Sequence, residues 1–346
     1  MNLFTKIDIP ISDWQIDYKS HLAFFGSCFA DNISAQFAER KFNVLANPFG
    51  TVYNPISLES QVKAIADGKV FGEDDVFQDT RCDGLWHCWD AHSSLSASTR
   101  EECIAKLNAA AKQAREFLQK ADTVFITLGS AFVYYLKDSG KPVSNCHRQD
   151  PNLFTRRLIS VEEVACAIRE IVENLRKIAA TAENSNGREP RIVFTVSPIR
   201  HKGDGAHGNN LSKATVLLGI ERAIEEIAAS PLAPRNDIAE YFPSYEIVMD
   251  ELRDYRFYAD DMVHLSKTAE DYIFERMVDT YCDEKTRADI ARVEKFLKMA
   301  SHHIKDESSP ATAEFQKKLA AQAAELEKQI PGLDLAQEKD NRKKLC

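Results

Sequence analysis

The stretch HLAFFGSCFA, residues 21–30, decides the fold. Its first half is mostly apolar, which is typical of a strand buried on both faces. A helical pattern follows, in which Ala30, Ile33 and Phe37 fall on one face. The stretch therefore predicts a strand that turns at Gly26 directly into a helix, as in the first unit of a parallel sheet.

The alternation of strand and helix continues along the chain. Capping boxes at Thr99–Glu102 and Ser160–Glu163 open two amphipathic helices, and residues 211–229 form a third. Four further short apolar segments are predicted to be strands: Phe42 to Ala46, Thr123 to Leu128, Arg191 to Val196 and Tyr245 to Met249. This order predicts an α/β fold whose parallel sheet is covered by helices on both faces.

The chain of 346 residues is long enough for one α/β core with appendages. We predict one domain over residues 1–282, with an insertion at 58–98 near the site, and a helical C-terminal extension over 283–346. The extension is rich in Ala, Lys and Glu and its apolar stripes are thin. Its helices either pack on the core or join copies in a homo-oligomer. The glycine-rich segment 203–210 is predicted to be a mobile loop.

Composition excludes several function classes. The formal net charge is −9 and no basic cluster is present, which argues against a nucleic-acid partner. No apolar stretch is long enough for a membrane span, and residues 1–11 lack the features of a signal peptide. We therefore expect a cytoplasmic protein. Its eight cysteines, at irregular spacings, are expected to be reduced and mostly buried.

Ser27 lies where the first strand ends and its helix begins, the edge at which open α/β sheets bind ligands. The free N–H groups of a helix N-terminus favour a developing oxyanion there. Ser27 is thus a candidate nucleophile, although an N-cap would place a serine at the same position. Cys28 is a competing nucleophile, but a thiol one step past the turn is more often a small buried hydrophobe.

Asp261 and His264 follow the last predicted strand on one loop. A histidine there can take the proton of a serine, and an acid three residues earlier can hold the imidazole in the right tautomer. Asp260 offers a second carboxylate on the same loop.

Polar residues follow the other strands. Gly50 and Ser130 could provide an N–H and a hydroxyl to an oxyanion. The clusters Asn145–Arg148 and Ser197–His201 contain donors for a polar substrate, although ordinary surface loops contain the same residues.

Cys82, His87, Cys88 and His92 are candidate metal ligands. Four ligand types within eleven residues could form a Cys₂His₂ site, but their spacing matches no usual zinc pattern. Trp86 and Trp89 fit better with an aromatic wall or lid beside a cleft. No glycine-rich phosphate loop is present. We therefore expect no metal and no cofactor.

The sequence resembles the GSCFA domain family, a bacterial branch of the SGNH (GDSL-like) hydrolase superfamily. The resemblance runs from about Ile7 to about Cys282. It is carried, in order, by GSCFA at 26–30, NPFGTVYNP at 47–55, TLGSAFVY at 127–134, NCHR at 145–148, SPIRH at 197–201 and DDMVHLS at 260–266.

The resemblance implies a flavodoxin-like three-layer α/β/α fold and gives roles to particular residues. Ser27 matches the nucleophile, Gly50 the second-block glycine, and Asp261 with His264 the acid and base. The third block departs from the superfamily pattern, because Ala131 stands where an asparagine is expected. Removing one such donor typically costs about 2.7–4 kcal/mol of transition-state stabilisation.

We therefore expect a serine hydrolase of carboxylic esters, acting through an acyl-enzyme at Ser27 on an O-acylated carbohydrate or similar polar substrate. The Ser27 and Gly50 N–H groups, with Ser130 or Asn145, would hold the oxyanion. The expected substrate contacts are Trp86, Trp89, His92, His147, Arg200 and His201. Three alternatives stay open: an O-acyltransferase, a catalytically degenerate binding module, and a cysteine hydrolase using Cys28 and His147.

Overall fold

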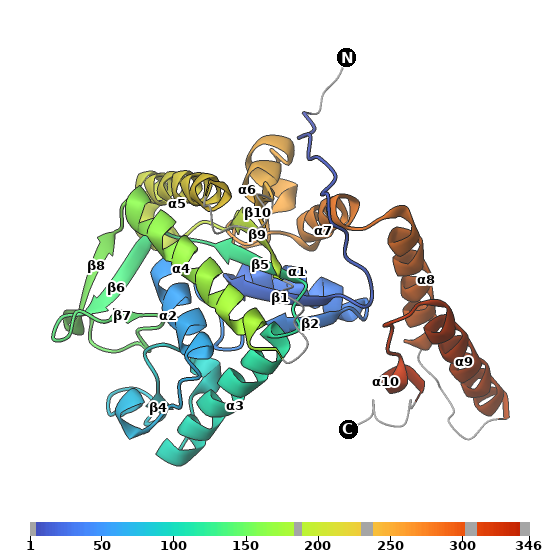
Figure 1. Ribbon diagram of the computed structural model, residues 1–346, viewed down its shortest axis with the longest axis horizontal. Coiled ribbons are helices and arrows are strands. Elements are labelled where there is room, and N and C mark those ends of the chain that lie inside the picture. The colour runs from blue at the N-terminus through green and yellow to red at the C-terminus, as the bar shows by residue number, and fades with distance from the viewer. Residues whose placement is uncertain (1–4, 183–188, 230–237, 302–309, 340–346) are drawn as a thin grey trace.

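The computed structural model describes residues 5–182, 189–229, 238–301 and 310–339. Within these ranges strands and helices alternate as far as residue 281, and helices alone follow to residue 339 (Figure 1). Residues 5–20 form neither helix nor strand and lead through a turn into the first strand.

A parallel sheet forms the centre of the described chain, with its strands in the order β10-β9-β5-β1-β2. The strands are β1 His21–Gly26, β2 Asn43–Ala46, β5 Thr123–Leu128, β9 Arg191–Val196 and β10 Ala239–Tyr241. In chain order this is 2-1-3-4-5, the order of flavodoxin-like doubly wound sheets. The expected three-layer α/β/α fold is confirmed. Its winding reverses between β1 and β5, and sheets of this kind bind ligands at the carboxyl ends of the strands beside such a reversal.

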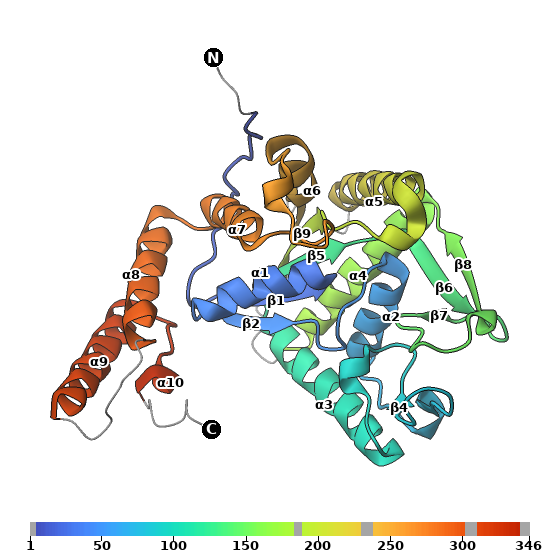
Figure 2. The ribbon, with the colours of Figure 1, turned by 180° about the vertical axis from the view of Figure 1, so that it is seen from behind.

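Helices cover both faces of the sheet (Figure 2). One face packs against α1 Cys28–Glu39 and α7 Lys267–Tyr281. The other packs against α2 Pro55–Ala66, α3 Arg100–Leu118, α4 Val161–Ala180 and α5 Gly205–Ala228. All these helices except α5 begin with a side-chain N-cap, from Ser27, Asn54, Thr99, Ser160 and Ser266.

β1 shows why a mostly apolar run makes a central strand. Leu22 and Phe24 join the hydrophobic core on the α1 and α7 side, while Ala23 and Phe25 join the core on the opposite side. Phe24 also stacks on Phe125 of the neighbouring strand, with ring centroids 4.7 Å apart. Since both faces are buried, polar residues are tolerated only at the strand ends.

Two predicted elements were wrong. Residues 245–249 are helical: α6 spans Ser244–Glu246 and a wider helical turn continues over Ile247–Glu251. The fifth strand is β10, which precedes them. A short apolar run has no periodicity that separates a strand from a buried helix. The segment 203–210 is largely the first turns of α5 and not a loop.

Two small antiparallel sheets lie beside the main one. β3 Phe77–Gln78 pairs with β4 Trp86–His87, and β6 Phe132–Leu136 pairs with β7 Pro142–Val143 and β8 Phe154–Leu158. The first part of the predicted insertion at 58–98, up to Ala66, belongs to α2, which packs against α4.

The C-terminal extension is helical, as predicted, and contains α8 Glu284–Ala300, α9 Pro310–Gln329 and α10 Ala336–Lys339. It packs on the end of α1 that lies far from Ser27: Arg40 pairs with Glu294 and Lys41 with Glu338, each at 2.6 Å. None of the described helices combines the length and apolar character that crossing a membrane requires.

Candidate active site

The turn after β1 is built around a glycine. Gly26 has a φ of +126°, and a Cβ on it would lie 2.0 Å from the carbonyl oxygen of Thr127 on β5. The Gly26 N–H donates to Oδ1 of Asn47 at 2.8 Å, and the Ser27 N–H donates to the Thr127 carbonyl at 3.2 Å. β5 and the loop after β2 therefore fix the turn at the point where the winding reverses.

Ser27 occupies this turn as the N-cap of α1. Its Oγ accepts a hydrogen bond from the Phe29 N–H at 3.3 Å, and the residue is only 1% exposed. Its Cβ lies 3.7 Å from where a Cβ on Gly129 would stand. The hydroxyl is therefore enclosed by the β5 loop, as the capping interpretation requires, and a substrate carbonyl has little access to it.

Cys28 is more accessible than Ser27, contrary to the expectation that it is a small buried hydrophobe. The residue is partly exposed. Partial burial, followed by the charge of Asp31, raises the pKa of its thiol, while the N–H groups of Cys28 and Phe29 act in the opposite direction. These N–H groups place the sulfur at the N-terminus of α1.

Asp261 and His264 form the predicted acid–histidine pair. Oδ2 of Asp261 lies 2.5 Å from Nδ1 of His264, and its Oδ1 accepts the N–H groups of Val263 and His264, each at 2.9 Å. These hydrogen bonds, led by that from the His264 ring, hold the pKa of Asp261 well below its usual range.

The same pair faces solvent. The side chains of His264 and Asp261 are 53% and 47% exposed. Among the described residues, Nε2 of His264 has no hydrogen-bond partner, since the only contact of the ring is through Nδ1. A histidine held in this way presents a free Nε2 that can exchange a proton with a nucleophile.

The pair and the turn lie at the same edge of the sheet. α7 starts three residues after His264 and packs against α1 (Figure 2). The Asn32 amide of α1 donates to Glu270 of α7, and the charge of His264 also acts on Glu270. The N-terminal turns of α1 and α7 are therefore neighbours, and both helix starts point toward the carboxyl ends of the strands.

The predicted oxyanion donors are already engaged. The Gly50 N–H donates to the Asn47 carbonyl at 2.7 Å, and His92 covers the glycine, since a Cβ there would lie 2.2 Å from the His92 Cβ. The Ser130 hydroxyl accepts from the Phe132 N–H and lies 3.2 Å from Oγ of Ser212. The oxyanion hole predicted from Ser27, Gly50 and Ser130 is therefore not preformed.

Asn145 and His147 stabilise a loop. Oδ1 of Asn145 accepts the His147 N–H at 2.8 Å, and the Asn145 N–H points to the carbonyl of Trp89. His147 is buried, its Nε2 lies 2.8 Å from the Cys88 carbonyl, and burial lowers its pKa to about 4. The His147 ring is enclosed by residues of the segment 77–154. The structure therefore lends no support to the predicted substrate contact at His147 or to its pairing with Cys28.

The other insertion residues predicted to contact substrate, Trp86, Trp89 and His92, do not lie together. Trp89 stacks on Phe77 with ring centroids 3.8 Å apart, and Trp86 lies under the Arg100 guanidinium. Trp86 thus packs against the start of α3, and Trp89 also contacts Phe154 of β8. His92 instead lies on Gly50, and its charge acts on Asp31 of α1, so it reaches the edge that contains the turn.

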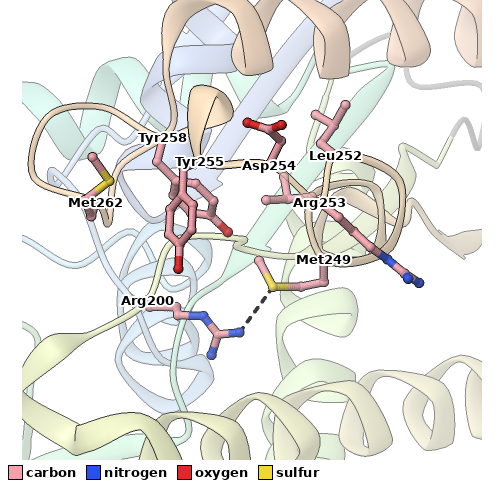
Figure 3. Close-up of a pocket in the computed structure, with 9 residues that line it drawn as sticks. Arg200, Met249, Leu252, Arg253, Asp254, Tyr255, Tyr258 and Met262 are labelled. Carbon is pink, nitrogen blue, oxygen red and sulfur yellow. Dashed lines mark hydrogen bonds between the residues drawn. The ribbon is translucent and has the colours of Figure 1, made fainter. Parts of the chain in front are cut away.

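A pocket of about 410 Å³ lies beside the Asp261–His264 loop (Figure 3). Tyr258 and Met262 of that loop line it together with Tyr255 and the predicted substrate contact Arg200. The side chain of His201 is 64% exposed, pairs with Asp204, and does not line this pocket.

Two buried polar side chains of α5 were not predicted. Lys213 is 1% exposed, and its Nζ donates to the Ser197 carbonyl at the end of β9 at 2.6 Å. Burial, followed by the charge of Arg200, lowers its pKa to about 7. Asn209, one turn earlier, is buried, and its Nδ2 has no partner among the described residues. A signal was present, because both residues share the apolar stripe with Val216 and Ile220.

The four candidate zinc ligands, Cys82, His87, Cys88 and His92, do not form one cluster. Within the described chain, Asp79, Asp83 and His87 bring ligand atoms within 4.8 Å of one another, without Cys82, Cys88 or His92. The Asp79 carboxylate already accepts N–H groups of residues 81–83. These hydrogen bonds belong to a turn of the backbone, and that turn accounts for the cluster without a metal ion.

The comparison with known families gives one match. The model of the GSCFA family matches residues 21–277, from the start of β1 almost to the end of α7. No curated protein matches the chain. The matched segment contains the turn, the Asp261–His264 pair and the buried face of α5, and it excludes the helical extension.

Proposed function

Because this chain belongs to the GSCFA family, and because its turn and histidine lie at one sheet edge, we propose that it is an SGNH-type hydrolase of carboxylic esters. The observation that carries the proposal is the 2.5 Å contact between Asp261 and Nδ1 of His264, which leaves Nε2 free. An oriented imidazole beside a strand-end nucleophile is the arrangement that acyl transfer requires.

The proposed reaction has two steps. His264 accepts the proton of a nucleophile in the Ser27–Cys28 turn, which attacks the ester carbonyl and forms an acyl-enzyme. His264 then protonates the leaving alcohol and activates the water that releases the acid. Asp261 stabilises the imidazolium throughout. The sequence assigns the attack to Ser27, and this assignment stays a prediction.

The pocket beside the loop supports a polar substrate. Tyr255 and Tyr258 offer aromatic faces with hydroxyl groups, and Arg200 adds a cationic donor. Aromatic faces combined with a few polar groups suit a hydroxyl-rich molecule such as an O-acylated carbohydrate. Whichever part of the ester enters this pocket, its carbonyl would stay near the His264 loop, because Met262 belongs to both the loop and the pocket.

Turnover of short-chain p-nitrophenyl esters and of acetylated saccharides tests the proposal. We expect measurable hydrolysis by the wild type and loss of at least a hundredfold in kcat for His264→Ala. Asp260→Asn is the matched control, because it removes a neighbouring carboxylate and leaves the pair intact. Equal rates for wild type and His264→Ala would rule out this function.

One observation favours a second candidate, a binding module on a degenerate hydrolase fold. The third block lacks its asparagine, and the N–H groups of Ser27 and Gly50 are engaged. Binding of acetylated saccharides without turnover, unchanged in His264→Ala, would favour this candidate. An O-acyltransferase would use the same acyl-enzyme, and product analysis with and without an added sugar acceptor separates it from a hydrolase.

A further inference from the structure

The two adjacent candidates for the nucleophile have different surroundings. The hydroxyl of Ser27 is enclosed and accepts a bond from the Phe29 N–H. The thiol of Cys28 is partly exposed and lies at the free N–H groups of α1. At this turn, therefore, Cys28 is the more exposed of the two candidates.

Three elements bring polar or charged groups to this thiol. Asp31 comes from α1, Lys213 from α5, and Tyr53 from the loop after β2. Partial burial, and after it the charge of Asp31, raises the pKa of the thiol. The Asp31 carboxylate already accepts a bond from Asn47 at 2.6 Å. Lys213 favours the thiolate, and the thiolate in turn favours charged Lys213.

Lys213 has hydrogen-bond donors that an anionic partner could use. Its side chain is fully buried, yet Ser197 is the only acceptor that it contacts among the described residues. An ammonium group has three donors, so two of them lack a protein acceptor. The unpartnered Nδ2 of Asn209 lies one helical turn away. Unpaired buried donors are costly, and a negative charge at this edge would satisfy them.

Resting on the proposed function, we propose that the attacking atom is Sγ of Cys28 and that the acyl-enzyme is a thioester. Lys213 is a positioning residue in this scheme, since it favours the thiolate and touches no reacting atom. Ser27 keeps its place as the cap of α1.

The steps balance without any further reactant than water. Nε2 of His264 takes the thiol proton, the sulfur attacks the carbonyl carbon, and a C–S bond forms as the C–O bond to the alcohol breaks. The alkoxide leaves with the proton from His264. Water then attacks the thioester while His264 accepts its proton, the C–S bond breaks, and the proton returns to the thiolate.

The first experiment compares single variants in a Cys82→Ala/Cys166→Ala/Cys346→Ala background. It lacks the two thiols that are exposed among the described residues and the terminal cysteine. We expect Cys28→Ala to lower ester turnover at least a thousandfold and Ser27→Ala less than tenfold. The mass of the protein stopped during turnover should rise by one acyl group on Cys28. Neutral hydroxylamine should release that group, as expected for a thioester. Cys103→Ala removes a buried thiol of α3 that bonds to the Leu95 carbonyl; this variant is the control and keeps full turnover.

Two results would overturn the inference and leave the proposed function standing: an acyl group on Ser27, or turnover by Cys28→Ala near the wild-type rate. Absence of turnover and of any adduct in the wild type would instead remove the proposed function itself.

Alkylation tests the role of Lys213 without relying on catalysis. In the same background, iodoacetamide should modify Cys28 about tenfold more slowly in the Lys213→Met variant than in the protein that keeps Lys213. The reason is that less of Cys28 is then present as thiolate. The difference should shrink at high pH, where the thiol ionises without help. If the alkylation rate of Cys28 and its dependence on pH are the same in both proteins, Lys213 does not favour the thiolate.

Discussion

At the scale of single residues, Asp261 has one role that can be measured alone. Asp261→Asn keeps the size of the side chain but removes the charge that stabilises the His264 imidazolium. We expect kcat to fall by about 10³–10⁴-fold, with little change in the free energy of unfolding, because the side chain is half exposed. Steady-state kinetics on a p-nitrophenyl ester provides the measurement. A fall of less than threefold would show that His264 is oriented by another group.

Lys213 gives a second residue-scale prediction, which concerns stability. Burial lowers the pKa of its amine to about 7, whereas the unfolded chain keeps an ordinary lysine pKa of about 10.4. Below pH 7 both states are charged, so the cost of burying the charge is fully present. As pH rises from 7 toward 10 the folded amine is neutral while the unfolded one still binds a proton, so the cost fades.

Lys213→Met should therefore be more stable than the wild type at pH 6, by a few kcal/mol as an order of magnitude, and this gain should shrink by pH 10. Urea unfolding at both pH values measures it. Ser212→Ala is the neighbouring control, with no such pH dependence. A constant difference between wild type and Lys213→Met would show that the amine is not desolvated as its burial implies.

Side-chain direction is what the sequence could not predict at this scale. The positions of Gly26, Asp261 and His264 follow from motif and spacing. Whether Ser27 or Cys28 faces the edge depends on the backbone of one turn, which Gly26 and its contact with Thr127 set. The sequence also did not show that the donors of Gly50 and Ser130 are engaged. The Gly50 N–H turns back to the nearby Asn47 carbonyl, and the Ser130 hydroxyl meets Ser212, which is distant in sequence.

At the scale of elements, the contact between α4 and α5 controls where Asn209 and Lys213 lie. Gly219 permits it, since a Cβ there would be 2.3 Å from Cγ1 of Val164 on α4. We expect Gly219→Ala to destabilise the fold by about 1–3 kcal/mol and to lower activity by displacing α5. Gly208→Ala on the same helix meets only an ordinary 3.6 Å contact and should stabilise by about 0.5–1 kcal/mol. The urea midpoints of the two variants provide the measurement. Equal changes in stability would contradict a tight contact between Gly219 and Val164.

Element prediction succeeded where the pattern was long or capped. The predicted bounds of β5 and β9 match the structure, and the boxes at Ser160 and Thr99 mark the starts of α4 and α3. It failed at residues 245–249, where tertiary packing against α7 and the N-terminal segment makes the run helical. The start of α5 was missed because three glycines lower its helix propensity.

At the scale of the whole molecule, the two ends of α1 lie at opposite edges of the sheet. The N-terminus holds the turn, and Arg40 and Lys41 at the other end hold the helical extension. A helix of 12 residues is about 18 Å long, so the extension lies well away from the site. The sequence predicted its helices, but thin apolar stripes could not show which surface they cover.

This separation predicts that the extension contributes to stability and not to catalysis. Glu338 is buried and pairs with Lys41 across the junction. Lys41→Met leaves that carboxylate buried without its cation, which we expect to destabilise the protein by about 2 kcal/mol at pH 7. Ester turnover should stay unchanged, while α9 and α10 should be cleaved faster by limiting protease. Lys112→Met removes an exposed pair with Glu116 and should change neither property. A loss of turnover in Lys41→Met that matches its loss of stability would show that the extension is coupled to the site through α1.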